Sequence, residues 1–528
     1  MFRSIFTKVI LAKAILFLIG SSASYADVTK STIKTTVAPD RSALNQRPTN
    51  LPCVSIPSRS LTKAFGARAP VFNGVANIAR ECASPEDMKA IASGYSALAF
   101  DLYQTRPSYP DYNFLYSSGD TMQVLAMLAE GAKGETLKAA WQDMRTGLTG
   151  NRLHKAFSAA LLDSENRNQA ANLKQNFAIW GQSRSRKRQG ASYHFAAPFL
   201  NRLIRSYGAQ IAKVDFTDDQ ALGRAIPDAI NQWVMKNTDG AIPGLVYELP
   251  ERTRLTAVTT LSVDGAWQTL PASGDQRFAL LDGSHVLTPM LTFSGEFLYL
   301  AGEGINAFEL PLANSDLALT VLMPNEGRFA EFRSGLTAEK LDQLLSNMKP
   351  QTISVQVPNF RLHSSLWPPS DIMTHLVDSG VFIDGQADFS RVNGRGFLHL
   401  DNIDQHGSLN LDELGVQAHS ASEIVLRASL FEPAGNLYGV VITSSVSFIP
   451  CQDIPFWNPD LAQARPFIYL LRNRFTDTIL FMGQFTEADG AKVAPDSVTI
   501  NCRTTSVEST IDWREPEYGW LTEEKSSE

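Results

Sequence analysis

Cysteine is scarce in the 528-residue sequence: only Cys53, Cys82, Cys451 and Cys502 occur, and none belongs to a CxxC pair or a Cys/His cluster. With eight scattered histidines, this pattern disfavours zinc, and we expect no metal or cofactor. An even number of cysteines permits two disulfides in an oxidising compartment. Of the three pairings, we favour Cys53 with Cys82 and Cys451 with Cys502, because each pair lies outside the central part of the chain. Free buried thiols are the alternative.

Long hydrophobic runs are also rare. The clearest is residues 14–19, preceded by Arg3, Lys8 and Lys13 and followed by small residues that end at Ala26. This pattern is typical of a secretory signal peptide over residues 1–26. The run is too short for a bilayer, which needs about 20 apolar residues. We therefore expect a soluble exported protein, secreted to the extracellular space or the periplasm, with no membrane attachment.

The chain lacks an excess of positive charge. It has 47 lysines and arginines against 54 acidic residues, a net charge of −7. Removal of the signal peptide would leave about −10. An acidic protein of this kind is a poor partner for nucleic acid or anionic lipid, so we expect neither.

Motifs of nucleophilic catalysis are missing as well, since the sequence contains no GxSxG elbow and no HExxH. Ser60 and Lys63 form an SxxK pattern, but it lies in an irregular N-terminal segment, and the chain has no KTG triplet. Gly302 and Gly304 lack the third glycine of a dinucleotide site and are better interpreted as a turn. The sequence therefore predicts that the protein is not an enzyme.

Composition divides the mature chain into three parts. Residues 27–84 are rich in Ser, Thr, Pro and Arg, which indicates an extension or linker. Residues 85–485 alternate helical and strand patterns without Gly/Pro-rich breaks, as expected of one large domain. Residues 486–528 become polar and acidic, which is typical of a surface wrap or a disordered end.

Hydrophobic periodicity predicts helices early in this domain and strands later. Apolar residues at three- and four-residue spacing predict helices over residues 90–102 and 121–128. Alternation or continuous apolar runs predict strands over residues 317–323, 353–357, 398–400, 408–411 and 467–471. This order indicates an α+β fold with a mixed or antiparallel sheet.

Eight segments between about residues 113 and 485 resemble the serpin family in order and spacing. They are residues 113–117, 125–136, 230–234 with 237–242, 265–267, 309–311 with 321–324, 357–360, 387–390 and 466–467 with 480–485. The resemblance implies mixed and antiparallel sheets, about eight or nine helices and an exposed reactive loop. It also implies inhibition of a serine-type or cysteine-type peptidase by a monomer. The mechanism would be cleavage of the loop, covalent trapping of the peptidase and insertion of the loop into the central sheet.

The loop would begin after Asp412 and Glu413, where the sequence resembles the family's hinge. The hinge would begin at the flexible Gly415, and its small side chains would alternate onto one face of the inserted strand at Val416, Ala418, Ser420 and Ser422. Small residues are needed there because bulky ones would overpack the space beneath a covering helix. His419 would lie on the opposite, more solvent-facing side.

The resemblance places the scissile bond sixteen residues after Glu413, between Ser429 and Leu430, with Arg427 or Phe431 as alternatives. Attack at Arg427 would imply a trypsin-like target, and attack at Leu430 or Phe431 a chymotrypsin-like one. About 15 inserted residues at roughly 3.3 Å each would move a bound peptidase about 50 Å.

The chain departs from the family at the gate where the sheet opens. The family usually has a second serine after the Ser117 position, an asparagine on the next strand and a histidine before the hinge. This chain has Asp120, Thr259 and Gln405 instead, which predicts a substitute hydrogen-bonding network. Its nearby His406 would point to the other face. Trp267 is expected to pack beneath the point where the loop enters the sheet.

A second departure is a segment of roughly 25 extra residues between the predicted bond and Pro466, which we interpret as an additional strand or a docking surface. The alternative function is that of a non-inhibitory relative, such as a carrier, chaperone or structural protein. The small-residue hinge favours the inhibitor.

Overall fold

The computed structural model describes residues 83–104, 112–182, 193–216, 225–250, 252–302, 304–366, 374–394, 397–428 and 464–493. Several predictions from the sequence lie outside these residues. They are the signal peptide, the N-terminal extension, the SxxK pattern, all four cysteines, the predicted bond at Ser429 and Leu430, the alternative Phe431, and most of the insertion and tail.

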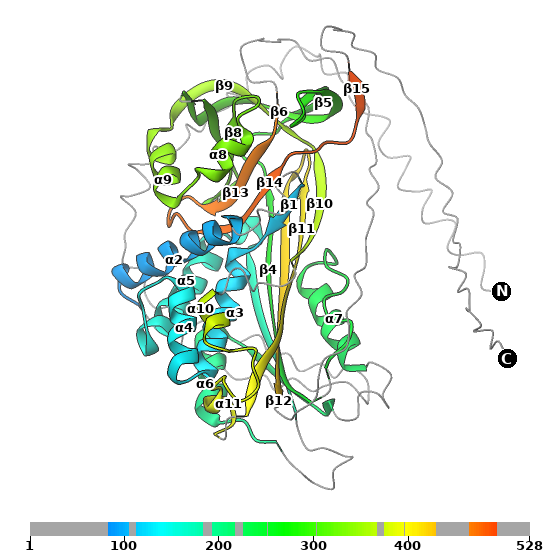
Figure 1. Ribbon diagram of the computed structural model, residues 1–528. Helices are drawn as coiled ribbons and strands as arrows, with labels where there is room; N and C mark the ends of the chain where they lie inside the picture. The colour runs from blue at the N-terminus through cyan, green and yellow to red at the C-terminus, as the bar shows by residue number, and fades with distance from the viewer. Residues whose placement is uncertain are drawn as a thin grey trace, which may run out of the picture. The chain divides into compact units, whose positions relative to one another are not determined.

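The first of two sheets has six strands in the order β10-β11-β12-β4-β2-β3 (Figure 1). Their bounds are β2 Lys174–Gln182, β3 Gln210–Val214, β4 Thr253–Ala266, β10 Phe360–Leu366, β11 Leu398–Leu411 and β12 Gly415–Ala428. Only β2 and β3 pair in parallel; the other neighbours are antiparallel. β12 lies in the interior of this sheet.

The second sheet has nine strands, with the order β1-β14-β13-β8-β7-β6-β15, and with β5 and β9 also paired to β6. Its bounds are β1 Phe114–Tyr116, β5 Ala272–Ala279, β6 His285–Gly302, β7 Ile305–Pro311, β8 Leu317–Pro324, β9 Lys349–Pro358, β13 Phe467–Asn473, β14 Ile479–Phe485 and β15 Ala491–Val493. Every residue of β8, β13 and β14 is buried. This burial on both faces explains their near-continuous apolar sequences.

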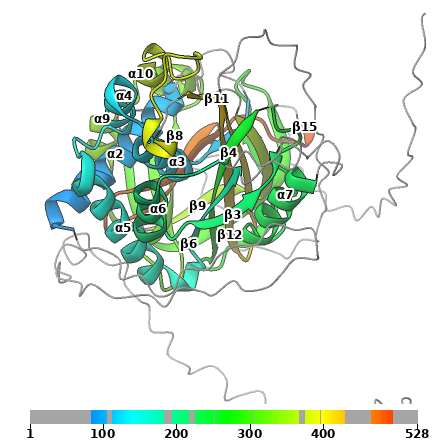
Figure 2. The same cartoon turned by 90° about the horizontal axis from the view of Figure 1, so that it is seen from below.

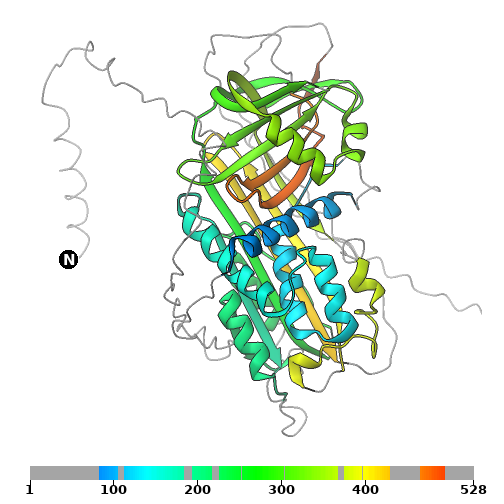
Figure 3. The same cartoon turned by 90° about the vertical axis from the view of Figure 1, so that its left-hand side faces the viewer.

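Helices cover both faces of the six-stranded sheet. The helices on one side include α2 Pro85–Gln104, α3 Ser118–Gly131, α4 Gly134–Met144, α5 Gly150–Arg167 and α6 Ala197–Tyr207, which Figure 3 shows in front of the strands. On the other side lies α7 Ala225–Asn237, as Figures 1 and 2 show. The remaining elements are η1 Gln169–Ala171, α8 Phe329–Ser334, α9 Ala338–Asn347, α10 Thr374–Asp378 and α11 Ser390–Asn393. None of the described helices is long and apolar enough to cross a membrane.

The α+β fold and all the predicted strands are confirmed, as are the helices expected over residues 90–102 and 121–128. Residues 398–400 and 408–411 belong to one continuous strand, β11. The described residues contain ten α-helices, and we expected eight or nine. The number includes three short helices, α8, α10 and α11. The main difference concerns the hinge. It was expected in an exposed loop, and the structure has it as strand β12.

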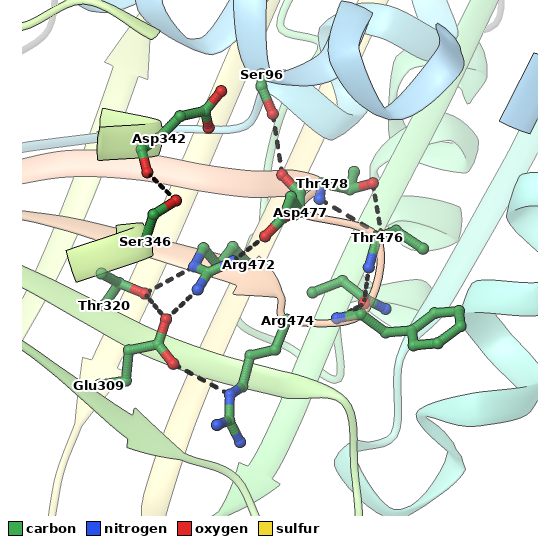
Figure 4. Close-up of polar contacts among 12 residues, drawn as sticks. Ser96, Glu309, Thr320, Asp342, Ser346, Arg472, Arg474, Thr476, Asp477 and Thr478 are labelled. Carbon is green, nitrogen blue, oxygen red and sulfur yellow. Dashed lines mark hydrogen bonds and ion pairs between the residues drawn. The ribbon is translucent and has the colours of Figure 1, made fainter. Parts of the chain in front are cut away.

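A buried ion-pair network fixes the hairpin of β13 and β14 within the second sheet (Figure 4). The Glu309 carboxylate bonds the guanidinium of Arg472 and also accepts from Arg474 Nε at 3.1 Å. Arg472 in addition donates to Thr320 Oγ1 and to Asp477. Glu309 lies on β7, Arg472 lies on β13, and Arg474 comes directly after β13. The network therefore joins strands about 160 residues apart in sequence.

Candidate site of reactive-loop insertion

β12 is paired on both sides from Val416 to Arg427. Val416 faces Leu411 of β11 and Gly265 of β4, and further along Leu426 faces Leu400 and Leu255. Both pairings are antiparallel, so the main-chain groups of these residues take part in two ladders. The hinge residues therefore form a central strand of the sheet in this structure.

Gly415, the first residue of β12, is required by close packing. A Cβ atom at this position would lie 2.1 Å from the main-chain oxygen of Gly265. No side chain fits at that separation, which explains why glycine stands at the start of the strand.

The inner face of β12 points toward the helices and holds the predicted small residues. Val416, Ala418, Ser420 and Ser422 are all at most 1% exposed. Val416 and Ala418 join an apolar cluster with Trp267, while the two serines lie near α3. The alternation expected from the sequence therefore places these four side chains in a closed interior.

The outer face of β12 differs from the expectation. Gln417 is exposed, but His419 is only 5% exposed, and Ala421 packs in a cluster with Trp233 of α7. The prediction that His419 faces solvent is wrong, because α7 and the segment after it cover this part of the sheet. His419 Nδ1 lies 3.1 Å from Ser262 Oγ, and burial lowers its pKa.

The turn that leads into β12 is fixed by side-chain caps. Asp412 Oδ1 accepts from the main-chain N–H groups of Leu414, at 2.8 Å, and Gly415, at 3.2 Å. Trp267 Nε1 donates to the Asp412 carbonyl at 2.7 Å, and Glu413 accepts from Asn359. Trp267 thus lies at the entry point, as expected from the sequence.

Gln405 is the centre of the gate. Its Oε1 accepts from the Ser117 main-chain N–H at 2.8 Å, and its Nε2 donates to the Ser117 carbonyl at 3.0 Å. The same Nε2 group lies within hydrogen-bonding distance of Thr121 Oγ1 and of Ser422 Oγ on β12. Ser117 also caps α3 by accepting from the Asp120 N–H. Gln405 therefore connects three elements where the inserted strand passes.

Asp120 and Thr259 complete the gate without strong bonds. Both are fully buried. Among the described residues, no group forms a well-aligned hydrogen bond with the Asp120 carboxyl oxygens or with Thr259 Oγ1. Burial raises the pKa of Asp120 to about 7, and the nearby hydroxyls of Ser420, Thr259 and Ser422 lower it only in part. The substitute network expected from the sequence is thus centred on Gln405. His406 points to the other face, where it interacts with the main chain of Gly244.

Among the residues considered for the scissile bond, Arg427 is the one that the structure describes. It lies in β12, opposite His399, and its Nη1 forms an ion pair with Asp401 at 2.7 Å. Ala428 follows it in the strand and pairs with Leu398.

Two acidic residues near β12 were missed from the sequence. Glu423 of β12 is 3% exposed, and Asp404 of β11 stands directly opposite it. A charged residue one position beyond the small-residue hinge is the signal that could have identified this pair. Within the described part of the chain, no group of three or more His, Cys, Asp or Glu side chains could hold a metal ion.

Comparison with known proteins agrees with this geometry. Residues 93–488 match the family described as "Serpin (serine protease inhibitor)". The chain belongs to the serpin family, whose members are mostly inhibitors of peptidases and not enzymes.

Individual relatives are distant but nearly full length. An uncharacterised serpin-like protein of Thermococcus kodakarensis is 24% identical over 83% of this chain and 93% of its own. The leukocyte elastase inhibitor of Equus caballus is 26% identical over 76% of this chain and 100% of its own. Among solved structures, the thermophilic serpin tengpin in the latent state has a TM-score of 0.61 at 20% identity, covering 78% of this chain and 100% of tengpin. The latter likeness shows the fold.

Proposed function

We propose that the protein is an inhibitor that traps its target peptidase when its reactive loop is cleaved and inserted into the six-stranded sheet. The observation that supports this most is β12, because residues 415–428 fit between β11 and β4 with continuous pairing and a closed inner face. The target would form an acyl bond with the loop before insertion displaces it. Insertion of a fully paired central strand releases the free energy that distorts the trapped enzyme.

The bond that the sequence predicts, between Ser429 and Leu430, is compatible with the described bounds of β12. Ala428 is the last residue of the strand, so a cut after Ser429 leaves the whole strand on the N-terminal fragment. A cut after Arg427 would instead remove Ala428 from the inserted strand. Fourteen residues at roughly 3.3 Å each span about 46 Å, which would move a bound peptidase close to the far end of the sheet. We therefore prefer Ser429–Leu430 to a bond at Arg427.

We further propose that the protein acts after export, because residues 1–26 have the pattern of a signal peptide. N-terminal sequencing of the protein purified from its source should begin just after Ala26. A chain that retains Met1 and stays inside the cell would contradict this.

The inhibitor proposal is tested by mixing the protein with trypsin-like, chymotrypsin-like, elastase-like and subtilisin-like peptidases. We expect an SDS-resistant complex with at least one of them, and mass spectrometry of the released C-terminal fragment should show that it begins at Leu430. Ordinary cleavage in this region, with no covalent complex and no gain in resistance to denaturant, would contradict inhibition. That result would instead support a non-inhibitory relative.

A further inference from the structure

On the outer face of the sheet, an acidic residue of β12 stands beside an acidic residue of β11. The need for small side chains in the hinge does not explain this pair. Glu423 and Asp404 are direct cross-strand partners in the ladder between β12 and β11. Cross-strand partners have Cβ atoms about 5 Å apart, and like charges at this separation oppose each other. Ionisation of both residues would therefore destabilise the inserted strand at this point.

Burial makes this repulsion stronger. Glu423 is 3% exposed, and its Oε1 has no hydrogen-bond partner among the described residues. Opposite it on β4 stands Val258, which joins the apolar cluster of Ile226, Ile230 and Trp233 of α7. An ionised carboxylate in such apolar surroundings is poorly solvated.

Within the part of the chain that the structure describes, Glu423 forms no ion pair with a cation. Asp401 on β11 adds a second negative charge, and Arg427 forms an ion pair with Asp401. Burial lowers the pKa of His419, four residues before Glu423, and of His406, two residues after Asp404 on β11. Burial together with the charges of Asp404 and Asp401 raises the pKa of Glu423 well above its ordinary value, and burial raises the pKa of Asp404 to about 6.

We infer that insertion of β12 takes up a proton at the Glu423–Asp404 pair, so that acidic conditions favour the inserted form and neutral or basic conditions favour the exposed loop. This inference rests on the proposed function, since it requires the loop to move between the two states. In an exposed loop Glu423 would ionise near its ordinary pKa of about 4.3. Its pKa is raised only after insertion, so the relative stability of the inserted form falls as pH rises above that value.

The expected size follows from proton linkage. One proton taken up on insertion changes the equilibrium by about tenfold per pH unit between the two pKa values of the group. The inserted form should accordingly gain most over the exposed form below pH 6, where both Glu423 and Asp404 can hold protons. At pH 8, insertion requires one of two unfavourable events. Either a carboxyl of the pair takes up a proton from a basic solution, or an ionised carboxylate is buried in an apolar site.

The test compares the parent with Glu423→Gln, which keeps size and hydrogen bonding but cannot ionise. Each protein is cut in the loop at pH 7.5 and moved to pH 5.5 or 8.0. Its midpoint in guanidinium chloride is then compared with that of the uncut protein. We expect the gain on cleavage to be larger at pH 5.5 than at pH 8.0 in the parent, and this pH difference to shrink in Glu423→Gln. A matched control is Asp264→Asn, which removes an exposed carboxylate from β4 opposite Gln417 and should behave as the parent does.

The outcomes separate the two proposals. If the increase of the midpoint on cleavage depends on pH equally in the parent and in Glu423→Gln, the inference about the acidic pair is overturned. An increase of the midpoint on cleavage would still support insertion. A parent with no gain at either pH, together with no covalent complex, would overturn both the inhibitor function and this inference.

Discussion

The proposed function predicts that replacing Val416 by arginine converts the protein from an inhibitor into an ordinary substrate of the peptidase. The Val416 side chain is fully buried on the inner face of β12, opposite Leu411 and Gly265. The interior beside it is tightly filled, because a Cβ atom at Gly265 would already lie 2.5 Å from Leu312. An arginine at position 416 would enter the sheet with no space and no counter-charge.

The magnitude can be bounded from these contacts. An unpaired buried charge costs about 3 kcal/mol at the low end, before the strain of the larger side chain is added. A barrier raised by this amount slows insertion by about a hundredfold. Because insertion must outrun hydrolysis of the acyl bond, most target molecules would escape and leave cleaved protein behind.

The assay measures the number of inhibitor molecules consumed for each peptidase molecule trapped, together with the yield of SDS-resistant complex. Gln417→Arg is the matched control, since Gln417 is the next residue and its side chain is exposed. We expect Val416→Arg to lose nearly all complex and Gln417→Arg to keep it. Equal complex yield in the two variants would refute the idea that the inner face of β12 must close.

Three further outcomes are expected. Gln405→Ala should lower the free energy of unfolding by about 1–3 kcal/mol, measured in denaturant, because the buried Ser117 main-chain N–H would lose its acceptor; an unchanged midpoint would contradict this. Glu309→Gln should cost about 3–5 kcal/mol, because two buried guanidinium groups lose their shared carboxylate; Glu331→Gln, at an exposed ion pair, should leave the melting temperature unchanged. In Asp120→Asn the decline in the free energy of unfolding between pH 4 and 7 should become smaller. The native pKa of about 7 is above the ordinary value, so stability is lost as pH rises through this range.

The sequence predicts the parts of this site that depend on local pattern. Alternating small residues predicted which side chains of residues 415–422 would share a face, and continuous apolar runs predicted the buried strands β8 and β13. These signals are local because side-chain direction alternates along any strand. The small-residue requirement at Gly415 could likewise be expected, although its cause, the approach of the Gly265 carbonyl, became visible only in the fold.

The sequence does not predict contacts between residues that lie far apart along the chain. Gln405 bonds the main chain of Ser117, which is 288 residues away, and no pattern around either residue indicates that contact. The solvent exposure expected for His419 was wrong for the same reason. Alternation determines that His419 lies opposite Val416 and Ala418, but only the position of α7 determines that this second face is covered.

The two faces of β12 place opposite demands on insertion. The inner face is small, apolar or weakly polar, so it closes without steric strain and favours a paired strand. The outer face contains Glu423 beside Asp404, which opposes the same step whenever both are ionised. An inhibitor of the proposed kind needs both properties, because a loop that inserted before cleavage could no longer be attacked by a peptidase. The steric fit of the inner face does not change with pH, whereas the repulsion between Glu423 and Asp404 does, so we expect neutral pH to favour the exposed loop without altering the packing of Val416 and Ala418.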